Sequence, residues 1–213
     1  MSAVAGVAPR AAVPYRHVLH QHRAALITAL VLAGTAAVLS AGGRMWSADG
    51  GWGLTAGKAV AGLLPLFGGV QMAGPMVAEE LESGTYKMAW TQGVTPLRWL
   101  AAKAVVALGL LVGLEVALGW VNGTPLSFAP VPLAYVLLAV AFGTMVGLLV
   151  RRTTRATVVT GLALGVLMLA GQSQPHDTLG AQLTLALPLL AGTAVAAAAA
   201  CLLLHRASQG DAS

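Results

Sequence analysis

Apolar residues are gathered into six runs along the chain, near residues 24–42, 59–78, 100–121, 131–150, 156–172 and 181–204. Each run is close to the roughly 20 residues that an α-helix needs to cross about 30 Å of hydrocarbon. The runs lack the alternation of barrel strands, and open strands would leave backbone groups unpaired in lipid. The pattern predicts an all-α, polytopic membrane protein: a six-helix transmembrane domain over 24–204, a flank over 1–23 and a tail over 205–213.

Composition strengthens this interpretation. Of the 213 residues, 57% are hydrophobic and 9% are charged, against about 25% charged in a soluble domain. A globule of this composition could not cover itself with polar surface, so membrane lipid must be part of its solvent. The single cysteine, Cys201, excludes an internal disulfide.

The distribution of lysine and arginine predicts the orientation. With both termini cytoplasmic, ten of the 12 basic residues lie inside and only Arg44 and Lys58 lie outside. The formal net charge of +5 is thereby explained by topology, and we predict no nucleic-acid partner. We expect aromatic belts from Trp46, Trp52 and Trp120 outside and from Tyr15, Trp90 and Trp99 inside. Residues 14–23 are either an interfacial helix or an ordinary positive flank.

Small residues and prolines indicate how the helices pack. Three glycine pairs have a spacing of four, which places both members on one helix face: Gly109 and Gly113, Gly143 and Gly147, and Gly161 and Gly165. One or two of these pairs should mark close helix contacts, because 26 glycines produce some such spacings by chance. We expect Pro65, Pro75 and Pro188 to bend their helices.

Motifs of enzymatic chemistry are absent from the sequence. The stretch GWGLTAGKA, around Lys58, lacks the first glycine and the final Ser or Thr of a P-loop. His17, His20 and His22 are close together, but no carboxylates accompany them as metal ligands. We therefore predict no catalytic, cofactor or metal site on this chain, which is not itself an enzyme.

An acidic segment follows the second run. Glu79, Glu80 and Glu82 lie at the expected C-terminal end of a helix, where carboxylates oppose the helix dipole. Ser83, Gly84 and Thr85 predict a break, and residues 85–93 a short helix ended by Gly93. Thr95 then has the place of an N-cap, with Pro96 at the first position of the third span.

At these residues the sequence resembles the ABC-2 type permeases, the membrane subunits of one class of ATP-binding-cassette exporters. That family has an E-x-E-x-G-T pattern, a short helix, and then Thr/Ser-Pro with nearby Arg and Lys. The matching residues here are Glu80, Glu82, Gly84, Thr85, Thr95, Pro96, Arg98 and Lys103. The outer loops are short for this family, and a re-entrant hairpin before the last span is scarcely visible in residues 171–182.

The resemblance implies a permease of the bacterial inner membrane that works as a homodimer or with a similar subunit. ATP and Mg²⁺ would be bound by a separate ABC ATPase subunit, and the short cytoplasmic helix would be the coupling helix seated on it. The implied coupling segment comprises Glu79, Glu80, Glu82, Gly84, Thr85, Tyr86, Lys87, Met88, Trp90, Thr95, Pro96 and Arg98. Its carboxylates pair with basic groups of the partner, pair with Arg98 and the inner flank, or are simply solvated. Met88 and Trp90 contact the partner, or Trp90 lies at the lipid interface.

Two polar residues fall inside the runs. Glu115, in the third, is either a wall of the translocation path that favours cationic amphiphiles or a protonated or hydrogen-bonded interhelical group. Gln71, in the second, belongs to the same path or makes an interhelical hydrogen bond. Two other functions remain open: a secondary transporter driven by protons through Glu115, and a structural or sensor protein that transports nothing. Drug, lipid, peptide and polysaccharide cargo all fit an apolar bundle.

Overall fold

The computed structural model describes residues 23–46, 62–121, 130–172 and 179–210, together with positions 56 and 60. Within these ranges every regular element is helical, as predicted. Four helices there are long and apolar enough to cross a membrane, over Pro96–Trp120, Pro130–Val150, Thr153–Ala170 and Gly180–Ala207. The count of six spans and their orientation stay predictions. The His17 to His22 group, residues 14–22 of the possible interfacial helix, and residues 173–178 of the segment 171–182 lie outside the described residues.

Each of the six apolar runs contributes a helical segment. The second run is divided into three consecutive pieces, and a short helix follows it. In chain order the elements are α2 (Arg23–Trp46), α4 (Leu64–Phe67), the π-helix η1 (Gly68–Ala73), α5 (Gly74–Ser83), α6 (Tyr86–Thr91), α7 (Pro96–Val121), α8 (Pro130–Val150), α9 (Thr153–Gln172) and α10 (Leu179–Gly210).

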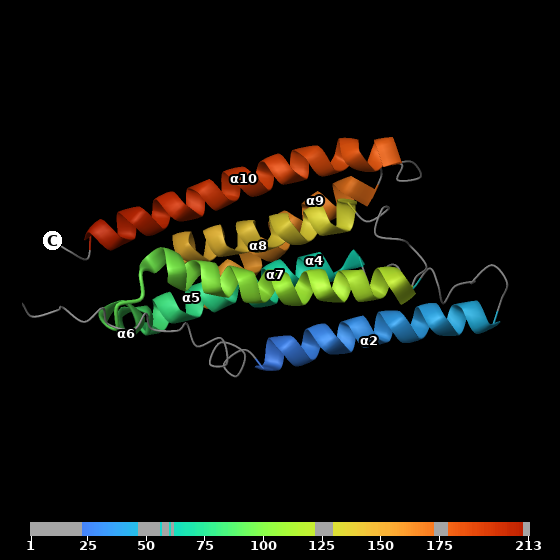
Figure 1. The fold of residues 1–213 in the computed structure, drawn as a ribbon, viewed down its shortest axis with the longest axis horizontal. Coiled ribbons are helices and arrows are strands. Elements are labelled where there is room, and N and C mark those ends of the chain that lie inside the picture. Colours follow the sequence, from blue (N-terminus) through green and yellow to red (C-terminus); the bar gives the residue numbers. More distant parts are fainter. Residues whose placement is uncertain are drawn as a thin grey trace, which may run out of the picture.

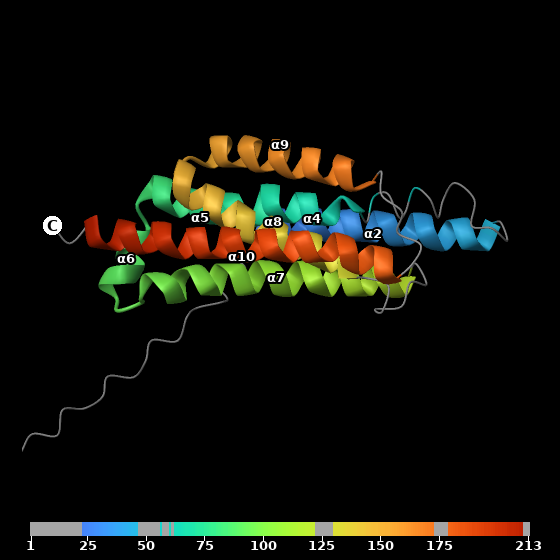
Figure 2. The ribbon, with the colours of Figure 1, turned by 90° about the horizontal axis from the view of Figure 1, so that it is seen from above.

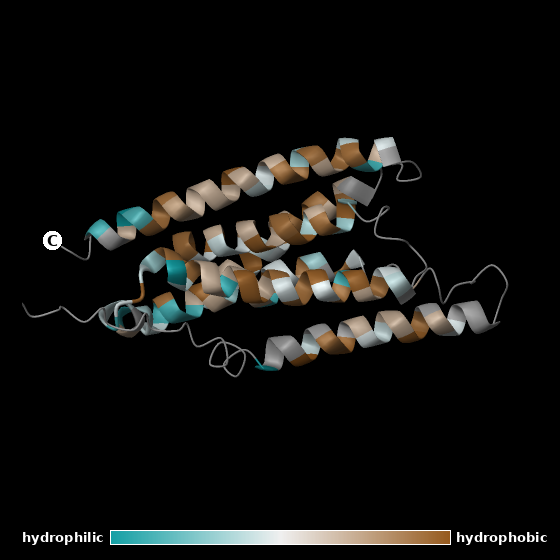
Figure 3. Cartoon of the chain, viewed as in Figure 1, coloured by the Kyte–Doolittle hydropathy of each residue, from teal (hydrophilic) through white to brown (hydrophobic). Residues whose placement is uncertain are grey.

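The long helices lie side by side in an elongated bundle with α8 at its centre (Figures 1 and 2). Helices α5, α7, α9, α10 and the π-helix all pack against α8, whereas α2 lies at one edge and mainly contacts α7. Short α6 and the C-terminal end of α10 are at the same end of the bundle, which we call the α6 end. Hydrophilic residues gather at the α6 end, and apolar residues dominate the lengths of the helices (Figure 3).

The second run is not a regular α-helix, because a π-helical turn precedes Pro75. Proline has no N–H and its ring collides with the carbonyl one turn earlier, so it disturbs the regular α-helical hydrogen bonding. Here the backbone N–H of Gly74 bonds to the carbonyl of Gly69, five residues back, which is the π-helical pattern. A bend was predicted at Pro75, and the structure shows a π-helical widening of the helix just before it.

Close packing of this segment against α8 depends on glycines. A Cβ on Gly147 would lie 2.6 Å from the Gly74 carbonyl oxygen, and one on Gly143 would lie 2.9 Å from the Gly69 carbonyl oxygen. The pair at 143 and 147 is thus a true close contact, as the spacing predicted. Gly109, Gly113 and Gly165 have nothing within 4 Å of a Cβ. Their spacing is consequently not a packing signal in this chain.

Replacing Gly147 by alanine should destabilise the bundle, because the new methyl group meets a backbone carbonyl that cannot rotate away. We expect a loss of about 1–3 kcal/mol in the free energy of unfolding. Gly113→Ala is the matched control. It should be neutral or slightly stabilising, since alanine is the better helix former and space there is open. Reversible unfolding in mixed detergent micelles, followed by circular dichroism, measures both; equal stabilities would contradict the packing role.

Candidate functional site

The segment between α5 and α7 has the local structure that its residues predict. Helix α5 ends at Ser83, and Gly84 follows in the left-handed conformation with φ 72°, which glycine adopts at little steric cost. After α6 the chain turns again at Gly93, with φ 82°. The hydroxyl Oγ1 of Thr95 then accepts a hydrogen bond from the backbone N–H of Arg98 at 3.4 Å, and Pro96 begins α7. The predicted break, short helix and N-cap are confirmed.

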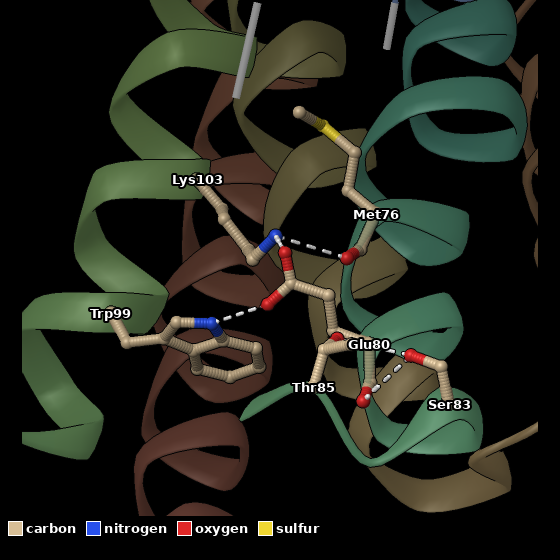
Figure 4. A network of polar contacts seen from close by, with 6 residues as sticks. All are labelled: Met76, Glu80, Ser83, Thr85, Trp99 and Lys103. Carbon is tan, nitrogen blue, oxygen red and sulfur yellow. Dashed lines mark hydrogen bonds and ion pairs between the residues drawn. The ribbon is translucent and has the colours of Figure 1, made fainter. Parts of the chain in front are cut away.

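An ion pair joins the two helices on either side of this segment. The ammonium Nζ of Lys103, on α7, lies 2.7 Å from Oε1 of Glu80, on α5. It also donates a hydrogen bond of 3.2 Å to the backbone carbonyl of Met76. Trp99, one turn before Lys103, donates its indole N–H to Oε2 of Glu80 at 2.6 Å. Both carboxylate oxygens therefore have a partner (Figure 4).

This cluster is charged although it is largely shielded from solvent. The side chains of Lys103 and Glu80 are 3% and 14% exposed. Removing two charges from water costs several kcal/mol each, and only good geometry with further hydrogen bonds compensates that loss. The Met76 carbonyl and the Trp99 indole supply those bonds, and the Trp99 ring lies 5.4 Å from the ammonium. The two helices are held together where α6 connects them.

Glu82 binds a different helix. Its Oε2 accepts the backbone N–H and the hydroxyl of Thr153, each at 2.9 Å. Thr153 is the first residue of α9, so the carboxylate satisfies a backbone donor that has no partner within the helix. The backbone hydrogen bond and then the hydroxyl bond lower the pKa of Glu82 below its ordinary 4.5. Glu82 thus fixes the start of α9 to the end of α5.

The three carboxylates consequently have three different environments. Glu79 is exposed, Glu80 pairs inside the bundle, and Glu82 caps a neighbouring helix. Partners on other helices offset the unfavourable position of Glu80 and Glu82 at the end of α5. Of the predicted alternatives, pairing within the protein is seen for Glu80, with Lys103 in place of Arg98, and pairing with a partner protein stays a prediction. Arg98 is exposed, whereas Lys103 is the partner of Glu80.

Helix α6 has an inner aromatic face and an outer polar one. Tyr86 and Trp90 are one turn apart with ring centroids 4.8 Å from each other, and Trp90 stacks edgewise on Trp99 at 6.5 Å. Lys87, Met88 and Thr91 are exposed, Met88 at 67%. Of the two apolar residues expected to reach a partner, Met88 is the one presented outward. Trp90 is half-buried against the bundle.

The apolar residues that α6 packs against include residues of helices distant in the sequence. Tyr86 and Trp99 share a buried cluster with Leu148 of α8 and Leu204 of α10. Trp99 is 6% exposed, so its expected place in an aromatic belt is wrong. Trp99 and Thr153 were not predicted as site residues, and Lys103 was named only as a member of the family motif. The spacing of Trp99 and Lys103 by one turn, with a lysine inside an apolar run, was the available signal.

The two polar residues of the apolar runs are not brought together with this cluster. Gln71 lies in η1 with an exposed side chain. Glu115 lies in α7, partly buried, and its Oε1 is buried without a hydrogen-bond partner. No group of three His, Cys, Asp or Glu residues that could hold a metal ion occurs in the described part of the chain.

Comparison with known proteins gives one match. The family model described as ABC-2 membrane transporter related matches residues 11–129, more than half of the chain. This range contains α2 to α7 and all of the cluster around Glu80. No curated protein and no solved structure matches the chain significantly.

Replacing Lys103 by methionine should destabilise the protein, because it leaves the Glu80 carboxylate without its cation. We expect a loss of about 2–3 kcal/mol in unfolding free energy, below the range for fully buried pairs because Glu80 keeps some exposure. The double variant Lys103→Met/Glu80→Gln should regain most of it. Arg98→Met, which removes an exposed cation from the same helix, should change little. Additive effects of the two single variants in detergent unfolding would contradict the coupling.

The Glu82 cap should make the start of α9 sensitive to acid. The pKa of Glu82 is lowered in the folded protein. The ionised carboxylate therefore contributes fully to stability above pH 4.5, and this contribution is lost as the pH falls through the lowered pKa. Amide hydrogen exchange, measured by mass spectrometry on the first turn of α9, should show greater protection in the native protein than in Glu82→Gln near neutral pH. In strong acid that difference should disappear. A difference that persists at all pH values would exclude the carboxylate as its cause.

Proposed function

From its membership of the ABC-2 membrane transporter related family, we propose that this protein is the permease subunit of an ATP-binding-cassette exporter, driven by a separate ATPase subunit. The observation that carries the proposal is the attachment of α6. This short helix has an exposed outer face, and the Glu80–Lys103 ion pair joins α5 and α7 on either side of it. Such a helix can receive a force from outside the membrane and pass it to both neighbours.

Force transmission requires that α5, α6 and α7 move as one body. If the connections were loose, displacement of α6 would be absorbed by the turns at Gly84 and Gly93, both of which have positive φ. Lys103 and Trp99 prevent this by joining α7 to Glu80, and the aromatic contacts of Tyr86 and Trp90 hold α6 to the bundle. Movement of α6 would then tilt the helix pair, a rigid-body switch.

The exposed residues of α6 indicate what kind of partner surface it would contact. Lys87, Met88 and Thr91 point outward, with Glu79 near the preceding helix end. Glu80 and Glu82 are already bound within the protein, so the expected carboxylate contacts with the partner reduce to Glu79. An apolar Met88 anchor beside Lys87 suits a partner groove with apolar walls and acidic groups. ATP and Mg²⁺ would be bound and hydrolysed on that partner, not on this chain.

The orientation of the bundle in the membrane and its oligomeric state complete the proposed function. The α6 end would face the cytoplasm of a bacterial cell, with the helices in its inner membrane, consistent with the ten-to-two distribution of basic residues. One bundle has no obvious two-sided pathway, so a second copy or a similar subunit would complete it. Gln71, exposed on the π-helix, and Glu115 are the polar residues proposed to face that path.

A charge on the outer face of α6 should abolish ATPase binding without unfolding the permease. In Met88→Glu the new carboxylate is solvated in the free protein, because Met88 is 67% exposed, but it would be buried in the complex. We expect at least a tenfold loss of a co-purifying subunit that has a P-loop and hydrolyses ATP, as for removal of an interface anchor.

Thr154→Glu is the matched control, since Thr154 is exposed in the first turn of α9 at the same end of the bundle. It should retain the subunit. Equal recovery in both variants would refute the docking role of α6. Transport that continues after ATP depletion but follows a proton gradient would support the secondary-transporter alternative instead.

A further inference from the structure

Glu115 is an acidic residue surrounded by apolar structure. It lies in α7 within the candidate span Pro96–Trp120, five residues before Trp120, or about 7.5 Å along the helix. On that helix it shares a face with Leu111 and Leu118, which are 0% and 3% exposed. Leu111 belongs to the cluster around Met72 and Val136, and Leu118 to the cluster with Ala33 and Ala36 of α2. The carboxyl group therefore lies between two apolar clusters.

The carboxyl group lacks the compensation that Glu80 has. Its Oε1 is buried and has no hydrogen-bond partner, whereas each oxygen of Glu80 has one. The ammonium of Lys103 is on the same helix, but about 18 Å away along its axis, and it is already bound by Glu80 and the Met76 carbonyl. A carboxylate in such a place is costly unless a cation or a proton joins it.

The residues around Glu115 favour some kinds of cation over others. A metal ion such as Ca²⁺ or Mg²⁺ needs several oxygen ligands, and the described residues contain no group of three acidic or metal-binding side chains. A hydrophobic organic cation needs only one counter-charge, because its apolar substituents pack against apolar walls. Leu111 and Leu118 of α7 make the surroundings of Glu115 apolar.

We propose that Glu115 of α7 is the counter-charge for hydrophobic monovalent organic cations, such as quaternary ammonium or phosphonium compounds. This names the cargo class of the exporter and so rests on the function proposed above. The carboxylate sets the sign of charge, and the apolar walls set the preference for hydrophobic substituents. Gln71, an uncharged residue, would not contribute to this choice.

The test measures tetraphenylphosphonium binding by the full chain in lipid nanodiscs, by equilibrium dialysis. We expect saturable binding that weakens at least tenfold in Glu115→Gln and is retained in Glu115→Asp. Neutral triphenylphosphine oxide should show no difference among the three proteins. Thr154→Ala, which removes an exposed polar group in the first turn of α9, is the control and should bind the cation as the native protein does.

A second measurement needs no variant. A hydrophobic carbodiimide should modify Glu115, and tetraphenylphosphonium, but not triphenylphosphine oxide, should protect it, as read by peptide mass spectrometry. Absence of saturable binding, equal binding by Glu115→Gln, or no protection would each overturn the inference. The proposed exporter function is judged separately by ATPase co-purification, which Glu115→Gln should leave unchanged. If the native protein co-purifies with the ATPase but does not bind the cation, the proposed cargo class alone is refuted.

Discussion

The ion pair between Glu80 and Lys103 is the constraint on which the arrangement of the α6 end depends. It joins helices whose connecting segment contains two glycines with positive φ, and that segment alone would be a weak mechanical link. A shielded ion pair contributes little net stability when compared with apolar residues of the same shape, yet breaking it is costly. Its value here is geometric, because it fixes how α5 and α7 meet and therefore where α6 is held.

A second constraint acts deeper in the bundle. The π-helical turn before Pro75 and the glycines of α8 allow the backbones of the second run and of α8 to approach closely. Helix association in lipid depends on such packing, since apolar side chains gain nothing by leaving one apolar medium for another. α5 is thus held to α8 by packing, to α7 by the ion pair, and to α9 by the Glu82 cap. A displacement of α6 would reach the bundle through all three contacts.

Glu80 and Glu115 illustrate how two glutamates of one protein differ by surroundings alone. Glu80 has an ammonium and an indole N–H as partners, whereas a buried oxygen of Glu115 has none. The first is explained by structure, because its charge is satisfied within the protein. The charge of the second is not compensated by any partner of that buried oxygen, and this difference underlies the proposed roles of Glu115 in substrate binding and of Glu80 in mechanical coupling.

The sequence by itself determined the features that depend on neighbours along the chain. Run lengths predicted the helices, Gly84 and Gly93 predicted the turns, and Thr95 with Pro96 predicted the start of α7, because propensities and caps are local effects. Tertiary structure alone decided the partners of the carboxylates. Glu80 meets Lys103 across 23 positions and Glu82 meets Thr153 across 71, and these pairings depend on how helices pack. Adjacent residues on a helix point about 100° apart, so Glu79 and Glu80 look alike in the sequence, although one is exposed and the other is bound within the bundle.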